Sequence, residues 1–291
     1  MVGVACSLKT GTGAEFMTAF LDPLLTFLTL LAAIYGVTLA LYFLYGLGIT
    51  WLNGRNPDRR IQKTRRGEKR MGAEIRQSAV SILVTSTSVS LGLFSQHMGW
   101  APTPWQLTWW NALPLFFLCM VISDLWFYAA HRLLHTKLFY RHHAFHHRSV
   151  APTAWSHDSM TVVDTALSQA HHTLMVFVIP FPPLIILANR AYDQINGTFG
   201  HAGFEYFASS TARFPSPMLC VFFHDQHHSE FRYNFGNYFS FWDRVFGTIA
   251  PDYDRRVAAL QVTAPPLRLV GTTAAAGHDA APSTQSDVPA E

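Results

Sequence analysis

Residues 124–147 read DLWFYAAHRLLHTKLFYRHHAFHH and hold six of the 15 histidines of the chain. At 3.6 residues per turn, Asp124, Tyr128, His131 and His135 fall on one face of a helix. A further helical pattern, H-x-x-H-H, follows directly at His143, His146 and His147. Histidines three and four residues apart on a helix can converge on one ion. The stretch therefore predicts a helical metal site.

The H-x-x-H-H pattern recurs much later in the chain, at His224, His227 and His228. Eight imidazoles exceed what one ion with about four to six ligands can use, which favours two ions. Imidazole suits zinc, copper, iron and nickel alike. The sequence contains neither the H-E-x-x-H motif of zinc hydrolases nor the E-x-x-H motif of soluble di-iron bundles. A pair of metal ions held entirely by nitrogen ligands points to redox chemistry, with a lipid as the expected substrate.

The composition indicates a membrane protein. Of 291 residues, 49% are hydrophobic and only 13% are charged, whereas an ordinary globular chain is about 25% charged. The net charge of +3 is too small to indicate a nucleic-acid partner, so partners are expected among lipids. Cys6, Cys119 and Cys220 are isolated in the sequence and are interpreted as unpaired small hydrophobic residues.

Three apolar runs predict membrane-spanning helices. Residues 23–54 contain no charged residue and no histidine, which predicts a first span near 24–51. Residues 55–76 carry nine bases and three acids, a net charge of 9 − 3 = +6, and such a loop is expected on the cytoplasmic side. Further spans are expected at about 79–96 and about 107–129, separated by a turn rich in proline and tryptophan.

Residues 160–200 form a further apolar segment, interrupted by IPFPP at 179–183. The segment suits a helical hairpin, crossing or re-entrant, whose prolines mark the far turn. Counted from the basic loop, both histidine-rich regions then reach the same cytoplasmic face. We expect an all-α, polytopic bundle of about four spans, or three plus a re-entrant hairpin, with a cytoplasmic helical cap that holds a di-metal site.

The same pattern divides the chain into four segments. Residues 1–22 form an N-terminal segment without the pattern of a cleaved signal peptide. Residues 23–129 are the transmembrane helices with their basic loop, and residues 130–254 are a catalytic region that includes the membrane hairpin. Residues 255–291 form a C-terminal segment, which is expected to be disordered from about residue 265 because Ala, Pro, Thr and Ser dominate there.

The order D-x-x-x-Y-x-x-H-R-x-x-H, then H-x-x-H-H, then H-x-x-H-H followed by NFGNYFSFWDRVFGT resembles the fatty acid hydroxylase/sterol desaturase superfamily. The resemblance covers roughly residues 75–250. It implies a small transmembrane base capped by a cytoplasmic domain with two iron ions. It also implies that O₂ and two electrons from a redox partner serve to hydroxylate or desaturate an unactivated C–H bond of a lipid.

The resemblance assigns metal ligation to nine histidines. They are His131, His135, His143, His146, His147, His201, His224, His227 and His228. Some relatives read H-x-x-x-H around the isolated histidine, where this chain has Gly197 in place of the first one. One ligand is therefore missing, replaced by a water, or replaced by Asn196 or His157.

Three further residues are candidates for a catalytic role: Asp124, Tyr128 and His157. Asp124 is expected to pair with His131 or Arg132, and Tyr128 to join that network. His157 resembles the histidine of an A-x-x-H-P-x-E setting, although Asp158 and Ser159 follow it here.

The remaining histidines are expected to have other roles. His171 and His172 are expected to line a substrate or water path, whereas His142 is interpreted as a surface residue. His97 and His278 are expected to be unrelated to the site.

The implied partners are a membrane lipid and a separate electron-transfer protein, cytochrome b5-like or ferredoxin-like, with its reductase. The lipid is a sterol, a fatty-acyl chain or a related molecule, and the sequence does not choose among them. A zinc-dependent membrane hydrolase is the alternative enzyme, which the missing glutamate base disfavours. A heme-bearing carrier or a metal transporter is the alternative from another class, but its ligands would lie within the spans.

Overall fold

The computed structural model describes residues 13–269, and their side chains from residue 21 onward. This part of the chain is helical throughout and contains no β-strand, only the isolated bridges Arg60–Phe204 and Met218–Phe239. The predicted all-α fold is confirmed for it. Cys6, His278, residues 1–12 and residues 270–291 lie outside the described residues, together with the predictions made for them.

Within residues 13–269, three helices are long and apolar enough to cross a membrane: α1 (Gly13–Arg55), α2 (Met71–His97) and α3 (Ala112–Leu134). They correspond to the three predicted spans, as expected of an integral membrane protein. The third begins at residue 112 rather than 107, because Thr108 and Asn111 close a turn in which the Thr108 N–H donates to the Asn111 side chain at 2.8 Å.

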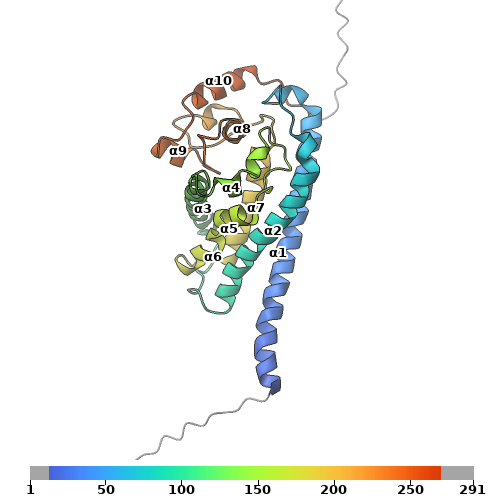
Figure 1. Ribbon diagram of the computed structural model, residues 1–291. Coiled ribbons are helices and arrows are strands. Elements are labelled where there is room, and N and C mark those ends of the chain that lie inside the picture. The colour runs from blue at the N-terminus through green and yellow to red at the C-terminus, as the bar shows by residue number, and fades with distance from the viewer. Residues whose placement is uncertain (1–12, 270–291) are drawn as a thin grey trace, which may run out of the picture.

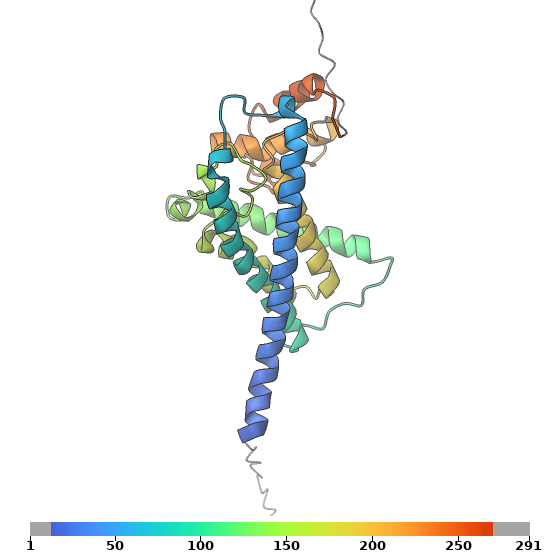
Figure 2. The same ribbon diagram turned by 90° about the vertical axis from the view of Figure 1, so that its right-hand side faces the viewer.

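α1 is the outermost of these helices and runs along the whole length of the protein (Figures 1 and 2). Only 11% of its most apolar 18-residue stretch is buried. Val37, Leu44 and Leu47 are each more than 60% exposed. α2 packs against α1, α5 (Val162–Gln169) and α6 (His171–Leu174), and 61% of its most apolar 18-residue stretch is buried. Its buried face carries small hydroxyl residues, among them Ser78 and Ser81, which let neighbouring helices approach closely.

The basic loop is shorter than expected, because α2 already begins at Met71. Short 3₁₀ turns at Pro57–Arg59 (η1) and Glu68–Arg70 (η2) lie within it. Glu74, which was counted as a loop acid, is fully buried on α2 and accepts a hydrogen bond from the Ser149 hydroxyl at 2.5 Å.

The segment 160–200 is a helical hairpin, as predicted. Its elements are α5 (Val162–Gln169), α6 (His171–Leu174), the 3₁₀ turn η4 (Met175–Phe177) and α7 (Pro183–Gly200). At its proline turn, the Pro180 carbonyl accepts the Trp105 N–H at 2.8 Å, and the Phe181 carbonyl accepts the Gln96 side-chain N–H at 2.9 Å. The turn between α2 and α3 and the hairpin turn therefore lie at the same end, away from the histidines.

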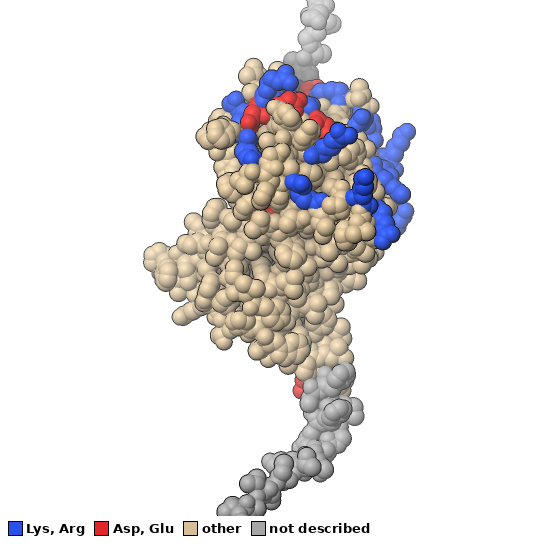
Figure 3. Space-filling model, turned by 60° about the vertical axis from the view of Figure 1, so that its left-hand side comes forward, with Lys and Arg blue, Asp and Glu red and all other residues tan. Residues whose placement is uncertain are grey.

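The histidine-rich end carries short elements that form a cap (Figure 1). They are α4 (Tyr140–His143), η3 (His146–Arg148), η5 (Ser210–Ala212), α8 (Val221–Glu230), α9 (Phe241–Val245) and α10 (Tyr253–Thr263). Phe222, Phe223 and Tyr253 are fully buried in its core. Figure 3 shows the lysines, arginines and acids gathered at this end of the molecule, while the lower body has almost no charge on the face shown.

Two smaller predictions also concern described residues. Cys119 and Cys220 are buried and unpaired, as expected. The segment that was expected to be disordered begins with an ordered stretch, because the Arg268 N–H donates to the Asn56 side chain at 2.8 Å and the Arg268 carbonyl accepts from it at 3.1 Å.

Candidate metal centre

The C-terminal end of α3 presents the first two histidines. His131 lies in the last turn, and His135 caps the helix with its backbone N–H on the His131 carbonyl at 3.1 Å. Their ring centres are 5.1 Å apart, as the spacing of four residues predicts.

The first H-x-x-H-H pattern is not the continuous helical face that the spacing predicted. His143 ends the one-turn helix α4, whereas His146 and His147 lie on the separate 3₁₀ turn η3. The helical bond from the Ala144 N–H to the Tyr140 carbonyl, at 2.7 Å, closes α4. Tighter i to i−3 bonds follow, such as Arg148 N–H to the Phe145 carbonyl at 3.2 Å, so the helix does not continue. Consecutive histidines therefore point in different directions.

The second H-x-x-H-H pattern lies on a regular helix, α8, as predicted. His224 and His228 are one turn apart on it, with their Nε2 atoms separated by 3.1 Å. His227 projects to one side of this pair, and its Nε2 lies 3.2 Å from the Nε2 of His147. Both patterns are thus divided between two sets of ligands.

The nine predicted ligand histidines converge in two groups. We define the first group as His131, His135, His143, His147 and His227, and the second group as His146, His201, His224 and His228; within each, one nitrogen per ring lies within 4.8 Å of all the others. Seven of the rings are buried, and His135 and His224 are half-buried. Each group draws on segments that are far apart in the sequence.

Hydrogen bonds at Nδ1 fix the direction in which the Nε2 lone pairs of four of these rings point. The Nδ1–H of His131 donates to the Phe235 carbonyl at 2.9 Å, and that of His227 donates to the Tyr233 carbonyl at 2.6 Å. His143 donates to the Asp164 carboxylate at 2.8 Å, and His201 donates to the Gly197 carbonyl at 2.8 Å. Because a neutral imidazole has one N–H, the Nε2 atoms of these rings carry lone pairs.

Burial keeps the rings neutral. It lowers the pKa of His143 and of His146 to about 3, with the adjacent imidazoles contributing at His146. Burial and neighbouring histidines hold the pKa of His147 and of His228 well below the usual range. At neutral pH the groups therefore present uncharged nitrogen donors, which is the state that binds a metal.

The spacing of the nitrogens fits metal ions. In the first group, Nε2 of His131 and His143 are 3.1 Å apart, and Nε2 of His135 and His147 are 3.0 Å apart. Lone pairs that face each other at this distance repel unless a cation lies between them. An ion bound about 2.1 Å from each imidazole nitrogen would hold neighbouring ligands about 3.0 to 3.4 Å apart. The nine histidines could therefore hold two ions.

Asp124 does not pair with His131 or Arg132, so that expectation was wrong. Its carboxylate accepts the backbone N–H groups of Asn237 and Tyr238 at 3.0 and 2.7 Å. Asp124 thereby anchors the loop after α8, two residues from the carbonyl that receives the His131 N–H.

Tyr128 forms its contacts away from the histidine rings. Its hydroxyl lies 2.9 Å from the Thr248 hydroxyl and accepts from Arg132 at 3.0 Å. The ring stacks on Phe246, with a centre-to-centre distance of 5.4 Å. Tyr128 therefore joins α3 to the cap.

Sequence reasoning missed two acids that hold the ligands in place. Asp164, fully buried at the start of α5, orients His143. Asp243, also fully buried, accepts the N–H groups of Phe235 and Gly236 at 2.9 and 2.7 Å and so fixes the loop that carries the acceptor of His131. The only sequence signal for Asp164 is an isolated acid in an otherwise apolar segment.

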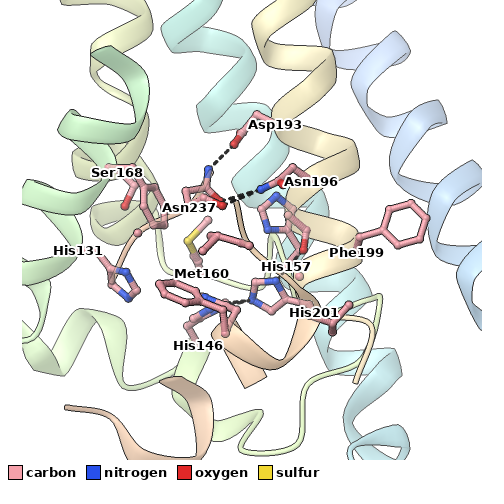
Figure 4. A pocket seen from close by; sticks show the side chains of 18 of the residues that line it. His131, His146, His157, Met160, Ser168, Asp193, Asn196, Phe199, His201 and Asn237 are labelled. Carbon is pink, nitrogen blue, oxygen red and sulfur yellow. Dashed lines mark hydrogen bonds between the residues drawn. The ribbon is translucent and has the colours of Figure 1, made fainter. Parts of the chain in front are cut away.

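A pocket adjoins both groups (Figure 4). Its walls are largely apolar and include Phe127, Met160 and Phe199. Asn237 forms a polar corner, donating to Asp193 at 2.8 Å and accepting from the Asn196 amide at 2.8 Å through its carbonyl. The other lining residues include His131, His143, His146, His157, His201 and His224.

The remaining histidines stand apart from the two groups. His157 lines the pocket beside His201, with the two ring centres 5.2 Å apart (Figure 4). His171 and His172 are buried against each other, with ring centres 4.0 Å apart, and do not line it. His142 accepts a hydrogen bond from its neighbour Arg141 at 3.1 Å, and His97 is exposed at the opposite end of α2.

Residues 116–248 match the family model described as fatty acid hydroxylase. The matched region contains all nine histidines, both H-x-x-H-H patterns and the pocket. Over these residues the chain is similar to the fatty acid hydroxylase/sterol desaturase superfamily. The predicted resemblance is therefore confirmed.

The chain is also similar to several curated proteins. It is 28% identical to methylsterol monooxygenase 1 of Gallus gallus over 57% of this chain and 55% of that protein. It is 28% identical to the Delta(7)-sterol 5(6)-desaturase ERG3A of Gibberella zeae over 46% of this chain and 36% of that protein. It is also 28% identical to lathosterol oxidase of Rattus norvegicus, over 44% of this chain and 42% of that protein. The chain spans about half the length of these relatives or less. No solved structure matches it.

Proposed function

We propose that the chain is a membrane-bound, O₂-dependent lipid hydroxylase or desaturase whose two iron ions are held by the first and second groups. The observation that carries the proposal is the convergence of nine neutral imidazoles, with nitrogens about 3 Å apart, beside a pocket with apolar walls. Iron is the proposed metal because an all-imidazole donor set suits it, and because relatives of the chain are named as monooxygenase, desaturase and oxidase.

Iron bound in the two groups would supply the reduction of O₂ and the removal of hydrogen from an unactivated C–H bond. The chain's own residues prepare the site for this chemistry. Asp164 and the carbonyls of Phe235, Tyr233 and Gly197 each accept an Nδ1–H, and so turn the opposite nitrogen toward the ion. Asp124 holds the loop 235–238 against α3, and Asp243 holds the same loop against α9.

The pocket would hold the lipid carbon that reacts. Phe127, Met160 and Phe199 exclude water from it, and the Asn196–Asn237–Asp193 hydrogen-bond chain offers one fixed polar contact (Figure 4). We propose a sterol, a fatty-acyl lipid or a related molecule as the substrate, because the surrounding helices present exposed apolar side chains to a bilayer. The three compared relatives are named for action on sterols or methylsterols, which favours a ring lipid.

We place the metal centre on the cytoplasmic side of the membrane. The loop between α1 and α2 is rich in arginine and lies at the same end as the cap, and basic loops beside membrane spans favour the cytoplasm. The proline turns lie at the opposite end.

We propose that a separate cytochrome b5-like or ferredoxin-like protein, served by a reductase, delivers electrons at an arginine-lined hollow. Arg65, Arg66, Arg70 and Arg148 line it without any acid among the lining residues. Phe231 also lines the hollow, and its ring centre is 4.8 Å from that of His147 in the first group. An acidic protein surface fits such a hollow.

The alternatives have less support. A zinc-dependent hydrolase needs a free carboxylate base near its metal. Asp164 is instead hydrogen-bonded to His143, and Asp193 is hydrogen-bonded to Asn237 and forms an ion pair with Arg190 at 2.8 Å. A heme carrier or a metal transporter would place its ligands along the spans, whereas these groups lie at one end of them.

The test is turnover of lipid extracts by the purified, iron-loaded chain, with O₂ and a reductant, followed by mass spectrometry. We expect products that gain one oxygen if the reaction is hydroxylation, or that lose two hydrogens if it is desaturation, and no product when O₂ is withheld. Hydrolysis products that form equally well without O₂ would contradict the proposal.

A further inference from the structure

The two groups are unequal, and the difference lies beside Gly197. The first group has five imidazoles and the second has four. Gly197 lies on α7 one turn before His201, a member of the second group, and its carbonyl accepts the Nδ1–H of that residue. A side chain at position 197 would therefore point along the same helix face as His201.

The imidazole of His157 occupies the space where that side chain would be. A Cβ atom built at position 197 would overlap three ring atoms of His157, namely Cε1, Nε2 and Nδ1. Only glycine at position 197 allows the ring to lie here.

Two further contacts fix the loop that carries His157. Trp155 packs against Gly46 of α1, where an added Cβ would lie 2.7 Å from the indole ring, and the Trp155 carbonyl accepts from the Tyr42 hydroxyl at 3.0 Å. The Pro152 carbonyl lies 2.6 Å from the position of a Cβ at Gly203. Close packing on separate elements holds the backbone of the loop, so the position of His157 is part of the fold.

The position of the His157 ring and the lack of hydrogen bonds at its nitrogens are those expected of a metal ligand. It is 8% exposed, and its centre is 5.2 Å from that of His201, the same distance that separates His146 from His201. Neither ring nitrogen forms a hydrogen bond to a described residue, and the nearest carboxylate oxygen, on Asp158, is 3.9 Å away. Asn196, the other candidate, directs its amide N–H to the Asn237 carbonyl instead.

We infer that His157 is the fifth nitrogen ligand of the second metal position, and that Gly197 is the residue that makes room for it. The inference rests on the two-metal site of the proposed function. His157 is not among the four rings whose nitrogens lie within 4.8 Å of one another, so a rotation of its side chain on the fixed backbone would bring its nitrogen to the ion. The second position then has five imidazoles, as the first does.

Cobalt(II) titration of the metal-free full-length chain in detergent tests the inference, with visible absorption as the reporter of coordination. The wild type is expected to bind two ions. His157→Ala is expected to bind the second ion at least about tenfold more weakly and with changed absorption, since even ligand-supporting residues contribute about 10- to 100-fold. Gly197→Ala keeps the histidine but displaces its ring, and is expected to show the same loss.

A double variant, His157→Ala with Gly197→His, places an imidazole one turn before His201 and is expected to recover the second ion. His142→Ala is the matched control and is expected to leave both ions unchanged. If His157→Ala and Gly197→Ala both bind two ions with wild-type affinity and absorption, the inference is wrong. If the wild type binds fewer than two ions, the proposed function itself fails. Circular dichroism of each metal-free variant identifies loss of folding. If His157→Ala does not fold, the Gly197→Ala result decides.

Discussion

The first and second groups use the same side chain in different settings. Three of the five rings in the first group donate their Nδ1–H to a fixed acceptor, and two of the five line the pocket. In the second group only His201 has such an acceptor. Among the described residues, Nδ1 has no partner in His147 of the first group, or in His146 and His228 of the second. Three of the four rings in the second group line the pocket. The first group is thus held by more hydrogen bonds to fixed acceptors, whereas the second contributes more rings to the pocket wall.

Loss of a whole ligand should separate the groups most strongly. With His157 as its fifth ligand, the second position keeps four rings in His224→Ala, but only His201 among them has a fixed acceptor. We expect this variant to lose one of two ions and at least about 100-fold of turnover. His227→Ala leaves four rings in the first group, and we expect it to retain both ions, the first about 10- to 100-fold more weakly. Metal analysis after dialysis measures both effects. Equal metal loss in the two variants would remove the distinction.

Removal of a supporting acid should have a smaller effect, confined to one group. Asp164→Asn replaces the charged acceptor of the His143 Nδ1–H by a neutral one, and we expect the first ion to bind about tenfold more weakly while the second is unchanged. Asp254→Asn is the control, because Asp254 pairs with Arg244 in the cap, at 2.7 Å. Competition with a chelator provides the measurement, and weakening of the second ion would contradict the assignment.

Charge reversal at the arginine-lined hollow should affect electron delivery alone. Arg65→Glu combined with Arg66→Glu is expected to raise the KM for an acidic donor protein about tenfold, since attraction to the hollow is lost. The KM of this variant is expected to depend on salt concentration no more steeply than that of the wild type. Turnover with a small neutral reductant should stay at the wild-type level. Arg255→Glu, on the exposed side of α10, is the control. An unchanged KM for the donor would exclude the hollow as its docking surface.

Much of the architecture could be predicted because it follows from local sequence. Charge-free runs located α1, α2 and α3, and the prolines at 179–183 located the hairpin turn. Counting crossings from the basic loop predicted that both histidine-rich regions reach one end, and the structure brings them together there. The spacing and the family resemblance together named the nine histidines that converge.

The remaining features depend on contacts between distant segments. The chain reversal after α3 breaks the first H-x-x-H-H pattern into two turns, so its division between two groups could not be read from helical periodicity. Asp124 bonds to the backbone of a loop more than a hundred residues away, and backbone partners leave no sequence signal. The overlap of His157 with the side-chain position of Gly197 likewise appears only in three dimensions.

The central claim is that two nitrogen-liganded iron ions lie side by side at the histidine-rich end. Iron per chain, measured on the purified protein together with X-ray absorption at the iron edge, tests it most directly. We predict two irons per chain, each surrounded mainly by imidazole nitrogens at about 2.1 Å. About one zinc per chain, with turnover that does not depend on O₂, would contradict the account.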